Sequence, residues 1–416
     1  MEAKQLKTSQ TKDKSNPQVK TAYRILFIIG FVHLLNDSIQ ALVPAMFPIL
    51  EAEMGLTYTQ IGIIAFALNM TASVIQPVVG VYTDKKPSPF ALPIGLCFTF
   101  IGVVLLAFAP NFWMVVIAVT FIGIGSATFH PEGSRVAHMA AGNKKGLAQS
   151  IYQVGGNAGQ ALAPLITLLI LVPLGQFGSI WFTLVAGLAI ILLLYIATWY
   201  KEQIKIQTLQ AKTKKAGPSI PTKYRRKILV GFGVLLFLVF VRSWFHAGLA
   251  NYYQFFAIEE YGMTISQAQV YLFIFLAAGA IGTFAGGPLA DRFGKRTILM
   301  LSMLGSAPFA LLLPHVGPIL AYPLIGIIGF IILSSFSVAV VYGQELIPGK
   351  IGVVSGLIVG LAFGMGAVGA VMFGIIADFV GMYTTMLIAV TFPIIGCLSF
   401  LLPSDQWMSD RLRNDH

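Results

Sequence analysis

Apolar segments that are long enough to cross a bilayer follow one another along almost the whole chain. A helix needs about 20 predominantly apolar residues to span the hydrocarbon core. Only 10% of the 416 residues are charged, against about 25% in soluble domains. The pattern predicts an all-α integral membrane protein with twelve transmembrane helices. The predicted spans are residues 23–50, 57–83, 90–109, 112–140, 144–173, 177–199, 225–258, 264–290, 296–314, 317–344, 350–378 and 382–403.

The basic residues are placed asymmetrically around these spans. Of the 27 Lys and Arg, all except Arg135 and Arg242 lie on the side of the N-terminal tail or at its interface. Lys and Arg are enriched in the cytoplasmic loops of membrane proteins. The net charge of +11 is therefore an orientation signal and not a nucleic-acid footprint. We expect a multi-pass protein of the bacterial inner membrane, with both termini in the cytoplasm and no nucleic-acid partner.

Two halves of six spans are separated by the longest polar stretch inside the chain. Motifs that begin at Gly55 and Gly80 recur 207 residues later, at Gly262 and Gly287. Secondary transporters often contain such repeats, with the substrate site between them near the bilayer midplane. The predicted organisation is a cytoplasmic tail (1–22), a six-helix bundle (23–199), a cytoplasmic linker (200–224), a second six-helix bundle (225–403) and a cytoplasmic C-terminal tail (404–416).

Several motifs resemble those of one transporter family. Residues 287–296, GPLADRFGKR, closely resemble the loop signature of the major facilitator superfamily, and residues 80–87 form a degenerate first copy. Residues 33–37 and 129–135, with the run 149–164, resemble the fosmidomycin-resistance branch of that superfamily. The resemblance covers essentially the whole chain. It implies the major facilitator fold, with two pseudo-symmetric six-helix bundles that work by alternating access.

The resemblance also implies gating residues. Acidic residues at the positions of Asp84 and Asp291 face the cytoplasmic start of the eleventh or fifth helix in the superfamily. The positive dipole end of that helix attracts them. We therefore expect Asp84, Asp291 and Arg292 to act as gates that hold the outward-facing state.

The first span carries four polar residues on one face. His33, Asn36, Asp37 and Gln40 recur at steps of three or four residues, which places them side by side on a helix. Asp37 lies about 21 Å along the helix from its cytoplasmic end, near the midplane. An ionisable group at that depth is costly and is usually functional. We expect Asp37 to exchange a proton and the other three to contact substrate, the alternative being a polar cluster that holds helices together.

The fourth span carries charges in its cytoplasmic half. Glu132 and Arg135 are three residues apart and are expected to pair on the helix surface. Pro131 is expected to kink the helix and aim these side chains inward. Glu132 and His130 are candidates for proton coupling, and Arg135 is a candidate for binding an anion because its guanidinium grips phosphonate in bidentate fashion. The alternative is a structural ion pair near the membrane face.

Further candidates lie in the fifth and seventh spans. Gln153 and Asn157 share a helix face beside several glycines, and we expect them to bind substrate unless this face only packs. Arg242 is expected inside the second half, where it holds an anionic group of the substrate or pairs with an acid such as Asp37. The alternative for Arg242 is that its side chain extends to the membrane interface.

These features together predict a proton-coupled antiporter that exports small toxic compounds. By resemblance its substrates are fosmidomycin-like phosphonates or other drugs, so that the protein acts in multidrug efflux and antibiotic resistance. Two alternatives remain, a proton-coupled importer of a small anionic metabolite and a membrane sensor without flux. The sequence contains no Walker-type loop and no paired Cys/His metal spacing. We expect no enzymatic activity, no cofactor and no metal, and a monomer whose partners are substrate, protons and lipid.

Overall fold

The computed structural model describes residues 21–86, 88–142, 145–210, 224–347 and 351–414. Within this part of the chain, eleven helical segments are long and apolar enough to cross a membrane. The predicted third span corresponds to α4 (Ala91–Ala107), an apolar helix of 17 residues that is shorter than the others. The all-α membrane architecture is confirmed with eleven long segments among the described residues, and the predicted number of twelve spans stays a prediction that depends on α4.

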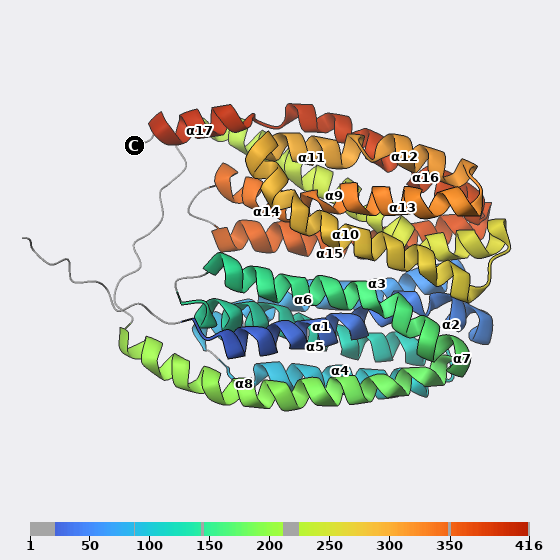
Figure 1. The fold of residues 1–416 in the computed structure, drawn as a ribbon, viewed down its shortest axis with the longest axis horizontal. Helices are drawn as coiled ribbons and strands as arrows, with labels where there is room; N and C mark the ends of the chain where they lie inside the picture. Colours follow the sequence, from blue (N-terminus) through green and yellow to red (C-terminus); the bar gives the residue numbers. More distant parts are fainter. Residues whose placement is uncertain (1–20, 87, 143–144, 211–223, 348–350, 415–416) are drawn as a thin grey trace, which may run out of the picture.

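The helices form two groups that lie against each other, with their axes roughly along the longest dimension of the molecule (Figure 1). The N-terminal half comprises α1 (Tyr23–Ala45), α2 (Phe47–Met54), α3 (Tyr58–Lys85), α4, α5 (Phe112–Ala140), α6 (Lys145–Ile166), a π-helical turn (Thr167–Leu171), α7 (Val172–Leu174), a 3₁₀ turn (Gln176–Trp181) and α8 (Phe182–Gln210). The C-terminal half comprises α9 (Arg225–Tyr261), α10 (Ile265–Phe293), α11 (Lys295–Leu304), α12 (Ala307–Leu312), a 3₁₀ turn (Leu313–His315), α13 (Pro318–Leu333), α14 (Ser335–Leu346), α15 (Ile351–Val380), α16 (Met382–Ala389), a 3₁₀ segment (Phe392–Leu401) and α17 (Asp405–Asn414).

The predicted repeat builds the same local structure in both halves. Gly55 and Gly262 end the preceding helices at φ 63°, a left-handed conformation that favours glycine. Thr57 and Thr264 then cap α3 and α10, and each forms a capping box with the glutamine three residues later. The first of the two motif pairs at the 207-residue offset therefore forms the same local structure in both halves.

Two helix pairs bring the halves together. Helix α3 packs against α15, and α6 packs against α10. We call the end of the molecule where α8 ends and α9 begins the linker end, and the end with the turns at Gly55 and Gly262 the far end (Figure 1). The C-terminal helix α17, predicted as part of a tail, lies at the linker end, where Trp407 packs on Lys227 at the start of α9.

The apolar cores are shared at the far end and separate at the linker end. One cluster joins both halves, from Ile39 and Leu50 in the first to Phe256 and Met386 in the second. Toward the linker end, one cluster belongs to the N-terminal half alone, and another to the C-terminal half alone. Close packing of apolar side chains therefore holds the halves together at the far end.

Hydrogen bonds between the halves follow the same distribution. Both carboxylate oxygens of Asp378 accept, at 2.8 Å, from the backbone N–H groups of Tyr58 and Thr59 at the start of α3. The amides of Gln254 and Gln269 donate, at 2.7 Å, to carbonyl oxygens at the end of α1. Among the described residues, the hydrogen bond between the halves that lies farthest from the far end is donated by the Ser73 hydroxyl to the Gly360 carbonyl. The structure is thus sealed at the far end.

Small residues allow α1 and α6 to pack closely. A Cβ atom at Gly155 would collide with the carbonyl oxygen of Gly30, and one at Gly159 with that of Leu34. Such close approach of helix backbones is typical of membrane bundles. It brings the polar face of α6 directly against that of α1.

Candidate functional site

A cavity of about 340 Å³ lies between the two halves. Residues of α1, α3, α5 and α6 line it on one side, and residues of α9, α10, α13, α14 and α15 on the other. Its apolar lining is concentrated on the C-terminal wall. The polar lining residues are His33, Asp37, Gln40, Asn69, His130, Tyr152, Gln153, Asn157 and Gln160 on the N-terminal wall, and Arg242, Ser243, His246, Asn251 and Thr283 on the C-terminal wall.

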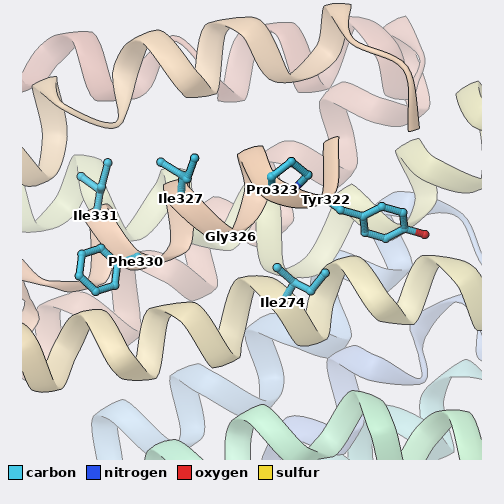
Figure 2. A pocket seen from close by; sticks show the side chains of 7 residues that line it. All are labelled: Ile274, Tyr322, Pro323, Gly326, Ile327, Phe330 and Ile331. Carbon is cyan, nitrogen blue, oxygen red and sulfur yellow. The ribbon is translucent and has the colours of Figure 1, made fainter. Parts of the chain in front are cut away.

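A second depression lies between α10 and α13 and is lined by Ile274, Tyr322, Pro323, Gly326, Ile327, Phe330 and Ile331. Figure 2 shows Ile274 pointing from α10 toward the residues of α13. These side chains are apolar apart from the Tyr322 hydroxyl. With no charged group in its lining, this depression provides no chemistry for a proton or an anion, and the central cavity is the candidate site.

Asp37 is buried and lies between two histidines. Its Oδ2 is 3.4 Å from Nε2 of His33, and its Oδ1 is 3.4 Å from Nε2 of His130. The amides of Asn36 and Gln160 donate to Oδ1 and Oδ2 respectively, each at 3.0 Å. Helices α1, α5 and α6 therefore converge on one carboxylate, which we call the Asp37 cluster (Asp37, His33 and His130).

The hydrogens on the outer nitrogens of both histidines can be assigned. Nδ1 of His33 lies 2.7 Å from the carbonyl oxygen of Tyr152, and Nδ1 of His130 lies 2.9 Å from that of Ser126. A carbonyl oxygen only accepts, so each Nδ1 donates, and a neutral ring then turns the lone pair of Nε2 toward Asp37. Two lone pairs facing a carboxylate repel it. A proton or another cation among these atoms relieves that repulsion.

The cluster is held firmly and opens at one member. The ring of Tyr152 stacks on that of His33 with a centroid separation of 4.0 Å. The side chains of His33 and Asp37 are 2% and 3% exposed, whereas that of His130 is 23% exposed. All three side chains line the cavity, and His130 is the member most exposed to it.

Arg242 provides a cation on the opposite wall. It is 5% exposed, and its Nη1 donates to Oγ of Ser335 at 3.3 Å. The guanidinium carbon lies 5.1 Å from the centre of the Phe336 ring. No carboxylate of a described residue lies within ion-pair distance of it, so Arg242 is not paired with Asp37 in this conformation. A buried guanidinium without a counter-ion favours an anionic ligand.

Glu132 and Arg135 form the predicted ion pair, with Oε1 and Nε 3.3 Å apart. The hydroxyl of Tyr200 donates to Oε2 of Glu132 at 2.9 Å, and Nη1 of Arg135 donates to the carbonyl of Thr83 at 2.8 Å. Neither side chain belongs to the cavity lining. The surroundings are those of a structural ion pair inside the N-terminal half, while proton coupling at Glu132 and substrate binding at Arg135 stay predictions.

The other predicted substrate residues divide between the cavity and its surroundings. Gln40, Gln153 and Asn157 line the cavity, and Gln153 donates to Asn157 at 3.4 Å. Asn36 is buried against Asp37 and does not reach the lining, and His33 lies in the Asp37 cluster. Their expected contact with substrate is not tested by this geometry.

The predicted gating residues lie near the linker end. Asp291 and Arg292 are exposed at the end of α10, where the Arg292 guanidinium packs on the Phe293 ring at 5.2 Å. No hydrogen bond or ion pair joins either of them to a described residue of the N-terminal half. The side chain of Asp84 lies outside the described part of the structure. The gating roles therefore stay predictions.

Sequence reasoning did not predict which residues position the cluster. The sequence places Gln160 on the same helix face as Gln153 and Asn157, at a three-residue step, but that reasoning assigned it no role in the site. Tyr152 and Ser126 act mainly through backbone carbonyl groups. Because every residue has a carbonyl group, no sequence signal marks this contribution.

Comparison with known proteins agrees with this architecture. The family model of the Major Facilitator Superfamily matches residues 26–361. The chain is 44% identical to the fosmidomycin resistance protein of Escherichia coli (strain K12), over 94% of this chain and 96% of that protein. It is 58% identical to the uncharacterized MFS-type transporter YfnC of Bacillus subtilis (strain 168), over 93% of this chain and 94% of that one.

Solved structures show the same fold at low sequence identity. A bacterial homologue of the human lysosomal transporter Spinster, in an inward-facing and occupied conformation, matches with a TM-score of 0.75 and 16% identity. The match covers 93% of this chain and 97% of that one. With a family model that covers most of its length and relatives that align almost end to end, the chain belongs to the major facilitator superfamily of membrane transporters.

Proposed function

We propose that the protein is a proton-coupled antiporter that exports small toxic compounds across the bacterial inner membrane. The observation that carries the proposal is the cavity between the halves, with the Asp37 cluster on one wall and Arg242 on the other. A relative with 44% identity is named for fosmidomycin resistance, which favours export of phosphonates or other drugs. The Asp37 cluster holds the proton, and Arg242 holds the anionic group of the substrate.

The topology follows from the basic residues. We assign the linker end to the cytoplasm, because Lys and Arg gather in cytoplasmic loops. We also count α4 as a membrane crossing, which brings the total to twelve. The far end then faces outward and is closed. In this conformation substrate reaches the cavity from the cytoplasm, and one chain supplies both walls of the site.

Antiport results when substrate and proton exclude each other at one place. Arg242 and the Asp37 cluster face the same cavity from different halves. A compound with an anionic group at one end and a hydroxyl or amine donor at the other can bind Arg242 and place its donor on Asp37. That donor occupies the position of the proton. When the far end opens, a proton arriving through His130 displaces the donor, and the substrate leaves outward.

The far-end seal makes a prediction for this cycle. Replacing Asp378 with Ala removes both hydrogen bonds to the start of α3 and a negative charge from the positive end of that helix. Charges at helix ends contribute about 0.3–1 kcal/mol when exposed, so the far-end-open population is expected to rise roughly two- to fivefold. Electron spin resonance distances between labels at Ala52→Cys and Glu260→Cys, on a background with Cys97 and Cys397 replaced by Ser, measure this shift.

Asp405 supplies a matched control for that experiment. Its carboxylate also accepts from two backbone N–H groups at a helix start, those of Lys295 and Arg296 at 3.1 Å, but within one half. Asp405→Ala is expected to leave the label distances unchanged. Equal distance distributions in the Asp378→Ala variant and the unmodified protein would show that Asp378 does not hold the far end closed.

A second candidate function is proton-coupled import of a small organic anion. The opposite charges of Asp37 and Arg242 favour it when the substrate carries an anionic group but no donor. Such an anion is attracted by Arg242 and repelled by an ionised Asp37, so proton and substrate then bind together rather than in competition.

Flux measurements distinguish these functions. Purified protein is placed in liposomes that contain a pH-sensitive dye, and fosmidomycin, chloramphenicol or a sugar phosphate is added under an imposed proton gradient. Proton movement opposite to drug flux supports the antiporter. Proton movement parallel to the sugar phosphate supports the importer. Binding of a compound without movement of either species contradicts both and leaves the sensor interpretation.

A further inference from the structure

The Asp37 cluster has the spacing of a metal site as well as that of a proton site. One ligand atom from each of His33, Asp37 and His130 lies within 4.8 Å of the other two. Each Nε2 is 3.4 Å from a carboxylate oxygen. Two ligands of one tetrahedral Zn²⁺ ion, each bonded at about 2.1 Å, are separated by about 3.4 Å. Each histidine therefore lies at this separation from one carboxylate oxygen, Oδ2 for His33 and Oδ1 for His130, and the three side chains surround one small volume.

The groups behind these ligands also match a metal site. Histidines that bind metals commonly donate their other ring N–H to a carbonyl or carboxylate, which fixes the tautomer and aims the lone pair. Here both Nδ1 atoms donate to backbone carbonyls, those of Tyr152 and Ser126. The carboxylate is oriented by two amides. Both Nε2 lone pairs face the same carboxylate, so a divalent ion placed between them would be bound by all three groups.

The ligand types indicate which class of ion would fit these side chains. Imidazole nitrogens suit zinc, copper, nickel and iron, whereas magnesium and calcium prefer oxygen ligands. Two nitrogens and one carboxylate leave a fourth position, and His130, which is 23% exposed, lies on the open side of the cluster. An ion entering from the cavity can reach all three ligands while keeping one position for water or another ligand.

We propose that His33, Asp37 and His130 bind one divalent transition-metal ion of the zinc class, at a site that opens to the central cavity. The proposal rests on ligand geometry and not on the proposed function. It revises the expectation of no metal, which rested on the absence of paired Cys/His spacing. His33 and Asp37 are one helical turn apart, but the third ligand comes from α5, far away in the sequence.

The test is direct binding of Zn²⁺ to the full-length protein after removal of any affinity tag and treatment with a chelator. Isothermal calorimetry with zinc chloride is expected to show about one ion per chain. His33→Gln and His130→Gln each remove one ligand and are expected to weaken binding by at least about 10- to 100-fold, which is the range found when only the hydrogen-bond partners behind metal ligands are altered. His246→Gln, a cavity histidine on the other wall, is expected to bind Zn²⁺ as the unmodified protein does.

A measurement on the unmodified protein covers the case in which the variants do not fold. Diethyl pyrocarbonate modifies accessible imidazoles, and bound Zn²⁺ is expected to protect His130 more than His246, as read by peptide mass spectrometry. Absence of stoichiometric Zn²⁺ binding, or equal protection of both residues, would overturn the proposal. Neither measurement of Zn²⁺ binding depends on transport. The metal site can therefore fail while proton coupling is confirmed in liposomes, and the reverse.

Discussion

Replacing Asp37 with Asn is expected to reduce substrate-driven proton movement to the level of empty liposomes. The amide keeps the shape of the side chain and can still accept a hydrogen bond, but it does not take up a proton as a carboxylate does. Substrate binding is expected to persist, because Arg242 lies on the other wall of the cavity. The dye signal of the reconstituted variant, with calorimetric binding on the same preparation, measures both quantities.

Glu132→Gln provides the comparison for this experiment. Glu132 is buried, but it contacts Arg135 and Tyr200 outside the cavity. Each folded molecule is therefore expected to keep its proton movement, while the variant loses stability because the buried ion pair between Glu132 and Arg135 is broken. Loss of proton movement in Glu132→Gln, with normal movement in Asp37→Asn, would show that the coupled proton binds at Glu132, inside the N-terminal half, and not at Asp37.

Replacing Arg242 with Ala is expected to weaken binding of a phosphonate by about 10- to 100-fold, the equivalent of one or two charge-assisted hydrogen bonds. The guanidinium is buried in the cavity wall, and no described carboxylate competes for it. Arg242→Lys is expected to restore part of the affinity, since an ammonium keeps the charge but loses the bidentate geometry. Calorimetry with fosmidomycin measures both variants.

Chloramphenicol serves as the uncharged probe for the same variants. Its affinity is expected to change little in Arg242→Ala if the arginine acts through charge. A comparable loss for both compounds would show that Arg242 shapes the cavity through its packing on Phe336, and the assignment of an anion site would then fail.

Much of the fold was predictable because its signals are local. Apolar length defined the spans, and the repeat at 207 residues reappears as two capping boxes, at Thr57 and Thr264. The pairing of Glu132 with Arg135 followed from helix geometry and is confirmed. The third span agrees least well with its prediction, because α4 has 17 residues and is shorter than the predicted span 90–109.

The site was less predictable because it depends on contacts between distant segments. Asp37 and His130 were each predicted for proton coupling, but their approach to 3.4 Å results from the packing of α1, α5 and α6. Sequence position also does not determine which face of α5 points toward the cavity. Arg135 was predicted both to pair with Glu132 and to bind substrate; the structure shows the ion pair and a hydrogen bond to Thr83, and substrate binding stays a prediction.

The division of the apolar core has a consequence for biosynthesis. The cluster at the linker end of the N-terminal half uses residues from Ile25 to Tyr200 alone. It can therefore assemble as soon as the first six spans have left the ribosome, before the second half exists. The cluster at the far end includes residues as late as Val390, so it is completed only near the end of synthesis. Maturation thus has two stages, and a chain truncated in the linker is expected to contain a packed but unpartnered half.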